Sequence, residues 1–106
     1  MNDPEINKRD FLKTMRNLGY PSNLIDKGAA LLKELCEILG NIDPSNTAEN
    51  VIYEHCQNTV QKFNDLQLEF EAAGSEFDTM AREFIADEFF LITQAFGYNL
   101  DLEKMI

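Results

Sequence analysis

The chain has 106 residues, 19 of them acidic and 9 basic, so its formal net charge at pH 7 is −10. Apolar residues make up 44% and charged residues 26%, which is typical of one globular domain and not of a disordered tail. A surface this negative repels phosphate and argues against nucleic acid as a partner. The apolar run Phe89–Ile92 falls far short of the ~18 residues of a membrane span.

The first predicted helix covers residues 8–18, with Asn7 placed to cap its start. Its apolar residues recur every three or four positions, which is the spacing of one buried helical face. Gly19 ends this helix. Tyr20 then precedes a proline, and a residue in that position avoids the helical conformation, so the pattern predicts a connector here.

The second predicted helix covers residues 23–39, with Ser22 as its cap and Gly40 at its end. Gly28 lies in the centre of its apolar face. A glycine inside a helix costs about 1 kcal/mol relative to alanine, so we expect another helix to approach closely at this position.

The third predicted helix is the longest, at residues 47–73, with Asn46 as its cap. Residues 76–96 form the fourth, capped by Ser75, and residues 99–106 add a short turn. These elements predict an all-α fold, an antiparallel four-helix bundle-like single domain over residues 1–106. The third helix must either overhang the first or bend, and an overhang would expose apolar surface that favours a homodimer.

The sequence offers few groups for catalysis or metal binding. Cys36 and Cys56 are expected to be free thiols, which fits a cytoplasmic location, as does an N-terminus without the apolar stretch of a signal peptide. His55 is the single histidine, and no CxxC, glycine-rich phosphate loop or serine elbow is present. We therefore expect no metal and no cofactor.

Glu88 and His55 are the two weak candidates for a catalytic role. Glu88 falls inside the apolar sector of the fourth predicted helix, and His55 lies at the edge of the apolar stripe of the third. If they meet, they form an acid–base pair in a pocket between these helices. The alternative is structural: a half-buried histidine, and a carboxylate at the rim of the core with a cationic partner. For that partner the candidates are Arg16, Lys13 and Lys62.

The negative charge is concentrated in the second half of the chain. Residues 1–53 hold 8 acidic and 6 basic residues, whereas residues 54–106 hold 11 and 3. Two apolar residues also point away from the predicted core, and such isolated hydrophobic residues on an acidic hairpin are typical of a docking surface for a basic protein. The alternative is a solvated face that keeps the protein soluble. The candidate contact residues are Leu68, Glu69, Glu76, Glu83, Asp87 and Phe90.

Several short stretches resemble a family of small acidic bacterial proteins known only as a domain of unknown function. They are Phe63–Gln67, Glu69–Glu71, Gly74–Glu76, Ala81–Glu83 and Ile85–Ala86, together with Asp26–Gly28 and Leu35–Glu37. The resemblance covers the chain from about Phe11 to Ile106. It implies a small, cytoplasmic, helical bacterial protein, and it brings no activity, cofactor or site residues.

Three functional hypotheses follow. The first is a non-catalytic interaction module that binds a basic protein through the acidic hairpin, as an immunity protein neutralises a basic toxin. The second is a small-ligand protein or enzyme that uses Glu88 and His55. The third is a homodimer, assembled through Leu68 and Phe90, whose assembly is itself the role.

Overall fold

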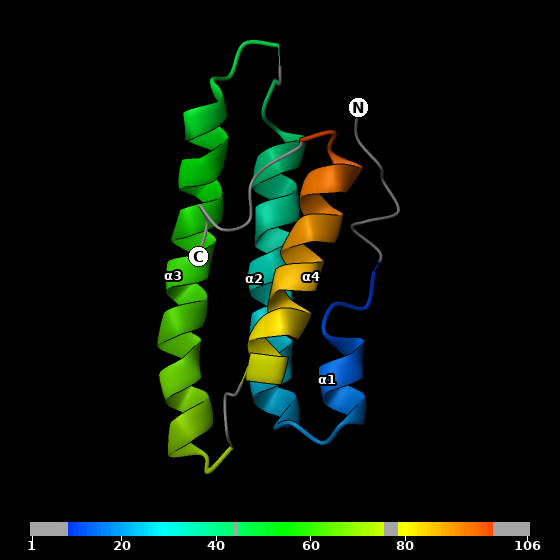
Figure 1. Ribbon diagram of the computed structural model, residues 1–106, viewed down its shortest axis with the longest axis vertical. Helices are drawn as coiled ribbons and strands as arrows, with labels where there is room; N and C mark the ends of the chain where they lie inside the picture. The colour runs from blue at the N-terminus through cyan, green and yellow to red at the C-terminus, as the bar shows by residue number, and fades with distance from the viewer. Residues whose placement is uncertain (1–8, 44, 76–78, 99–106) are drawn as a thin grey trace.

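The computed structural model describes residues 9–43, 45–75 and 79–98, and these residues form helices and loops with no strand among them. This confirms the all-α prediction. The helices are α1 (Lys13–Asn17), α2 (Ser22–Gly40), α3 (Glu49–Ala72) and α4 (Thr79–Ala95). The chain reverses direction between α2 and α3 and again between α3 and α4 (Figure 1). In the described ranges, every helix is too short or too polar to cross a lipid bilayer.

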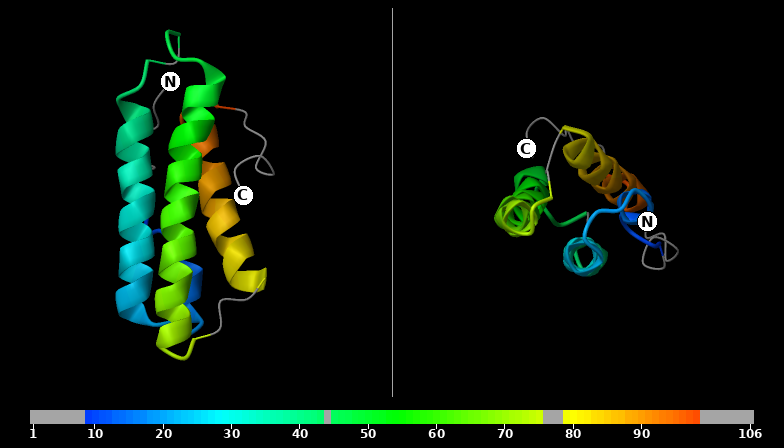
Figure 2. Two further views of the ribbon diagram at one scale, coloured as in Figure 1. Left: turned by 90° about the vertical axis from the view of Figure 1, so that its left-hand side faces the viewer. Right: turned by 90° about the horizontal axis from the view of Figure 1, so that it is seen from below.

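The helices pack unequally. The most extensive contact joins α2 and α3, while α1 contacts both α2 and α4. Seen end-on, α2, α3 and α4 stand at the corners of a triangle, and α1 lies beside α4 (Figure 2). The backbones of α3 and α4 are not closely packed over their described residues. Contact between these two helices is therefore made by large side chains. The rings of Phe63 and Phe89 meet edge to face there, with their centroids 6.0 Å apart.

The start of the first helix differs from the prediction over residues 8–18. Helix α1 begins only at Lys13, because Leu12 has a φ of 62°, in the left-handed region that a right-handed helix cannot contain. Phe11 and Leu12 are both buried, at 1% and 4% exposure. Neighbouring residues of a helix point about 100° apart, so the tight turn lets both side chains enter the core. Asn7 lies outside the described residues.

Two predicted caps are also wrong. Ser22 is the first residue of α2, and its hydroxyl accepts a hydrogen bond from Arg16 Nη1 at 3.0 Å instead of capping the helix. Helix α3 begins at Glu49, later than predicted, and Asn46 Nδ2 donates to Asp43 Oδ2 at 2.8 Å within the preceding loop. The side chain of Asn46, which the sequence predicted to cap the helix, is therefore used in a hydrogen bond within the loop. The predicted cap of the fourth helix at residues 76–78 and the turn at 99–106 fall outside the described residues.

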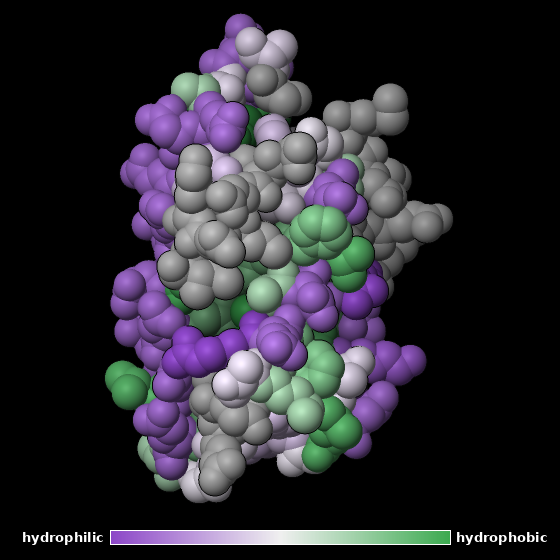
Figure 3. All heavy atoms as spheres, viewed as in Figure 1, coloured by the Kyte–Doolittle hydropathy of each residue, from purple (hydrophilic) through white to green (hydrophobic). Residues whose placement is uncertain are grey.

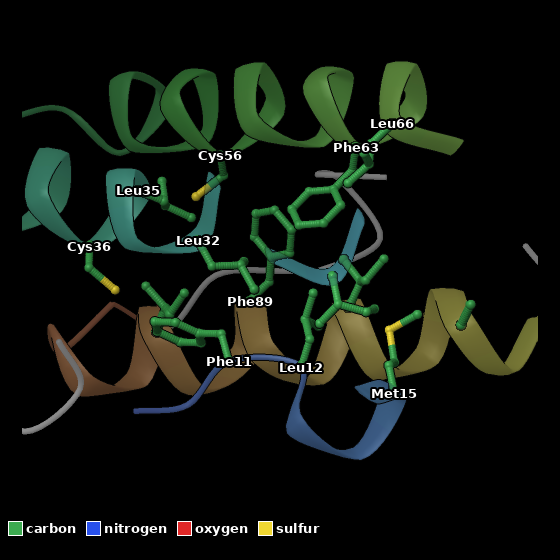
Figure 4. Packing of buried hydrophobic residues seen from close by; sticks show 14 of the residues in the cluster. Phe11, Leu12, Met15, Leu32, Leu35, Cys36, Cys56, Phe63, Leu66 and Phe89 are labelled. Carbon is green, nitrogen blue, oxygen red and sulfur yellow. The ribbon is translucent and has the colours of Figure 1, made fainter. Parts of the chain in front are cut away.

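The core is one cluster of buried side chains from all four helices and from residues 11–12. Figure 4 shows Phe63 from α3 and Phe89 from α4 near its centre, with Leu32 and Leu35 of α2 close by. At the far end of α3, the rings of Tyr20 and Phe70 make a second edge-to-face contact with centroids 6.3 Å apart. Aromatic rings thus fill the space that the diverging helices leave open.

Gly28 confirms the expected close approach. A Cβ atom built on Gly28 would lie 2.8 Å from Leu12 Cδ1 and 3.2 Å from Phe63 Cε1. The neighbours are therefore side chains, one from the turn before α1 and one from α3. Because Gly28 has no side chain, the left-handed turn at Leu12 packs directly against α2.

We predict that Gly28→Ala destabilises the protein by about 1 kcal/mol, because overpacking a filled core outweighs the gain in helix propensity. Chemical denaturation measures this change. In a Leu12→Ala background, Gly28→Ala should cost much less stability, because the Leu12 Cδ1 atom that the new methyl group would meet is absent. A Gly28→Ala variant that is more stable than the wild type would contradict this packing.

Candidate functional site

Glu88 on α4 is buried to 4% exposure and both of its carboxylate oxygens are bound. Its Oε1 accepts from Arg9 Nε at 2.8 Å and lies 2.7 Å from Arg9 Nη2. Its Oε2 accepts from the backbone N–H of Leu12 at 2.8 Å. These contacts join residues that lie 76 and 79 positions apart in the chain. Glu88 therefore ties the segment before α1 to α4.

The contacts of Glu88 compensate for the unusual backbone at Leu12. A non-glycine residue in the left-handed region costs roughly 1–2 kcal/mol, and a charge-assisted bond to its N–H offsets a cost of that size. The Arg9 side chain is 44% exposed, so solvent screens the ion pair and its contribution is smaller than that of a fully buried pair. The hydrogen bond from Leu12 is buried and is the stronger constraint.

The cationic partner of Glu88 is Arg9, which the sequence reasoning missed. Of the three partners expected from the sequence, Arg16 pairs with Asp26 and Lys62 pairs with Glu34. No ion pair joins Lys13 to any described residue. No sequence signal indicates this pairing, because the predicted continuous helix over residues 8–18 does not contain the turn at Leu12 that follows Arg9.

His55 lies on α3, where its side chain is half-buried. Its backbone carbonyl accepts a hydrogen bond from Thr59 Oγ1 at 3.3 Å. No hydrogen bond or ion pair joins His55 to Glu88, and both belong to the described residues. The two candidates for an acid–base pair thus have separate surroundings, and Glu88 is engaged by the opposite end of the chain.

The described part of α4 presents a mixed acidic and apolar surface to solvent. We call it the outward α4 face, and its residues recur at helical spacing: Met80, Glu83, Asp87, Phe90 and Leu91. Met80 is 51% exposed and Phe90 43%. Figure 3 shows this side of the molecule, on which hydrophobic and hydrophilic side chains lie next to one another. The carboxylates of Glu83 and Asp87 form no hydrogen bond or ion pair with the described residues.

The other predicted contact residues lie elsewhere. Leu68 on α3 is 64% exposed, as a contact residue must be. Glu69 is also exposed, but its carboxylate pairs with Lys27 Nζ of α2 at 2.5 Å. Glu76 falls outside the described residues. The sequence identified Glu83, Asp87 and Phe90 of the outward α4 face and left out Met80 and Leu91, which are 51% and 38% exposed.

The two cysteines are free and buried, and they lie on α2 and α3. Burial raises the pKa of Cys56 to about 11, and burial together with the nearby charge of Glu37 does the same for the pKa of Cys36. A raised pKa means that the fold favours the neutral thiol. Each neutral thiol therefore contributes to the free energy of unfolding below the ordinary pKa of 9.0, and this contribution is lost as the pH rises toward about 11. In the described ranges, no three histidine, cysteine or acidic residues are grouped so as to hold a metal ion.

We predict that neither thiol reacts readily in the native protein. At pH 8, a pKa of about 11 leaves roughly a hundredfold less thiolate than an ordinary thiol has, and burial restricts access further. The measurement is the rate of reaction with an aromatic disulfide reagent, with and without denaturant. A thiol that reacts equally fast in both conditions would contradict the buried placement.

We also predict that Glu88→Gln destabilises the protein by about 2 kcal/mol, because it removes the charge and leaves only one acceptor oxygen for Arg9 and Leu12. Glu88→Leu should cost about 3 kcal/mol, because it removes both acceptors. Hydrogen exchange at the Leu12 amide should accelerate in both variants. Asp87→Asn is the matched control, because Asp87 is exposed, and it should change stability by less than about 0.5 kcal/mol. Equal stabilities of the Glu88→Gln and Asp87→Asn variants would refute the anchoring role.

Comparison with known proteins gives a family and no activity. One protein-family model matches residues 5–106, and it is described as a family of unknown function (DUF5713). No curated protein and no solved structure matches the chain. Since the family match covers nearly the whole sequence, the chain belongs to the family of unknown function DUF5713.

Proposed function

We propose that the protein is a non-catalytic interaction module that binds a basic protein through the outward α4 face. The observation that carries the proposal is the combination, on one side of α4, of free carboxylates and exposed large apolar side chains. Hot spots of protein interfaces pair an apolar anchor with charges that orient the partner. Phe90 supplies the anchor, and Glu83 and Asp87 supply the charges.

The internal ion pairs explain why these carboxylates are available. One basic residue from each of the segment before α1, α1, α2 and α3 pairs with a carboxylate of a neighbouring element: Arg9, Arg16, Lys27 and Lys62. On α4 the one base, Arg82, donates to Gln67 Oε1 of α3 at 2.6 Å. The carboxylates of Glu83 and Asp87 form no ion pair within the described ranges, so they are available to a cationic partner.

Apolar exposure supports a protein partner over a simple ion. Met80, Phe90 and Leu91 are between 38% and 51% exposed, although the core buries most other large apolar residues of the described ranges. Phe90 and Leu91 are adjacent, and Met80 lies on the same face about 15 Å away along α4. Exposed apolar side chains that share a face support a protein interaction site. Leu68, at 64% exposure, lies on α3 and does not belong to this face.

The test is capture of proteins from a soluble extract of the source organism by the tagged chain, washed with rising salt. We expect a basic protein to be retained at low salt and released at high salt, because charges are screened beyond ~8 Å at physiological ionic strength. The variant that carries Glu83→Lys and Asp87→Lys should lose it. Phe90→Ala should weaken the purified complex about tenfold.

The matched control carries Glu37→Lys and Glu54→Lys, which change the net charge equally on exposed positions of α2 and α3. This control should still retain the captured protein. Equal loss in both charge-reversed variants would mean that only net charge matters, and that result rejects the outward α4 face. Retention that does not respond to salt would reject it as well.

A further inference from the structure

A shallow cleft of about 310 Å³ lies between the segment before α1, α1 itself and one side of α2. It draws no residue from the outward α4 face. Its charged lining residues are Arg9, Asp10, Arg16, Asp26 and Lys33, and Phe11, Ala29 and Ala30 add apolar atoms. This volume is at the lower end of the roughly 300–1,000 Å³ that small-molecule sites occupy.

The two arginines of the cleft are held in place by other residues. Glu88 binds Arg9 through Nε and Nη2. Arg16 donates from Nη1 to Ser22 Oγ at 3.0 Å and from Nη2 to Asp26 Oδ1 at 2.6 Å. Arg9 Nη1 and Arg16 Nε make no such contact with the described residues. Each guanidinium group is therefore fixed while an N–H donor remains for a ligand.

Asp10 and Lys33 are the two charged residues of the cleft that form no ion pair with the part of the chain that the structure describes. Both side chains are exposed, and neither forms an ion pair with the other or with any described residue. One cleft thus presents an anion and a cation that do not satisfy each other. A ligand that carries both charges would satisfy the two together.

We infer that this cleft binds a small zwitterion with one ammonium and one carboxylate group, of the kind that an α-amino acid carries. Lys33 and the remaining N–H donors of Arg9 and Arg16 bind the carboxylate. Asp10 binds the ammonium, and the methyl groups of Ala29 and Ala30 contact the carbon atoms between them. Because such a ligand has no net charge, the protein's net charge of −10 does not repel it as it repels a phosphate.

Titration of the isotope-labelled protein with L-alanine, propionate and ethylamine tests this inference by nuclear magnetic resonance. We expect L-alanine to shift the amide signals of Ala29, Ala30 and Lys33. Propionate lacks the ammonium and ethylamine lacks the carboxylate, so each should bind about tenfold more weakly. If propionate or ethylamine binds as tightly as L-alanine, or if L-alanine shifts none of these signals, the inference is wrong.

Two variants locate the binding site. Lys33→Gln and Asp10→Asn each remove one unpaired charge of the cleft and should weaken L-alanine binding about tenfold. Lys13→Gln is the matched control, because Lys13 is exposed, has no ion pair among the described residues and does not line the cleft. All three positions are exposed, so the variants should fold. Weakening by Lys13→Gln equal to that by Lys33→Gln would overturn the assignment.

Discussion

The buried carboxylate of Glu88 is the constraint on which the arrangement of the domain depends. A carboxylate inside a core is tolerated only when donors replace the water that it has lost. Here the donors come from Arg9 and from the backbone of Leu12, far away in the sequence. This requirement brings the segment before α1 against α4, fixes the left-handed turn at Leu12, and places the Leu12 side chain over Gly28. Without the Glu88 carboxylate, the left-handed conformation of Leu12 would still cost free energy, and the hydrogen bond that offsets this cost would be absent.

The pairing of basic residues between elements also determines which surface charges stay available to a ligand. The protein has few basic residues, and in the described ranges most of them link two elements through a carboxylate or an amide. Charges that remain without a partner are therefore informative. On the outward α4 face they are all negative and stand beside exposed apolar side chains, which suits a basic protein. In the cleft beside α2 one of each sign remains, as Asp10 and Lys33, which suits a small zwitterion.

Helical spacing and glycine positions were sufficient to predict the all-α class and the approximate extent of the three long helices. They also predicted the close approach at Gly28, because a costly glycine in an apolar face needs a packing reason. The start of α1 could not be predicted in this way. Its periodicity continues through Phe11, and only the tertiary bond from Leu12 to Glu88 reveals the turn. The unusual position of Glu88 was visible in the sequence, but its partner was not, since ion pairs between distant segments leave no local pattern.

A double-mutant cycle between Arg9 and Glu88 tests the central claim most directly. The free energies of unfolding of the wild type, Arg9→Gln, Glu88→Gln and the double variant give the coupling energy of the two side chains. If Glu88 anchors the segment before α1, the double variant loses less stability than the two single variants together, with a coupling of about 1 kcal/mol. Additive effects within about 0.3 kcal/mol would show that the two side chains do not interact, and the claim that Glu88 holds the segment before α1 through Arg9 would be wrong.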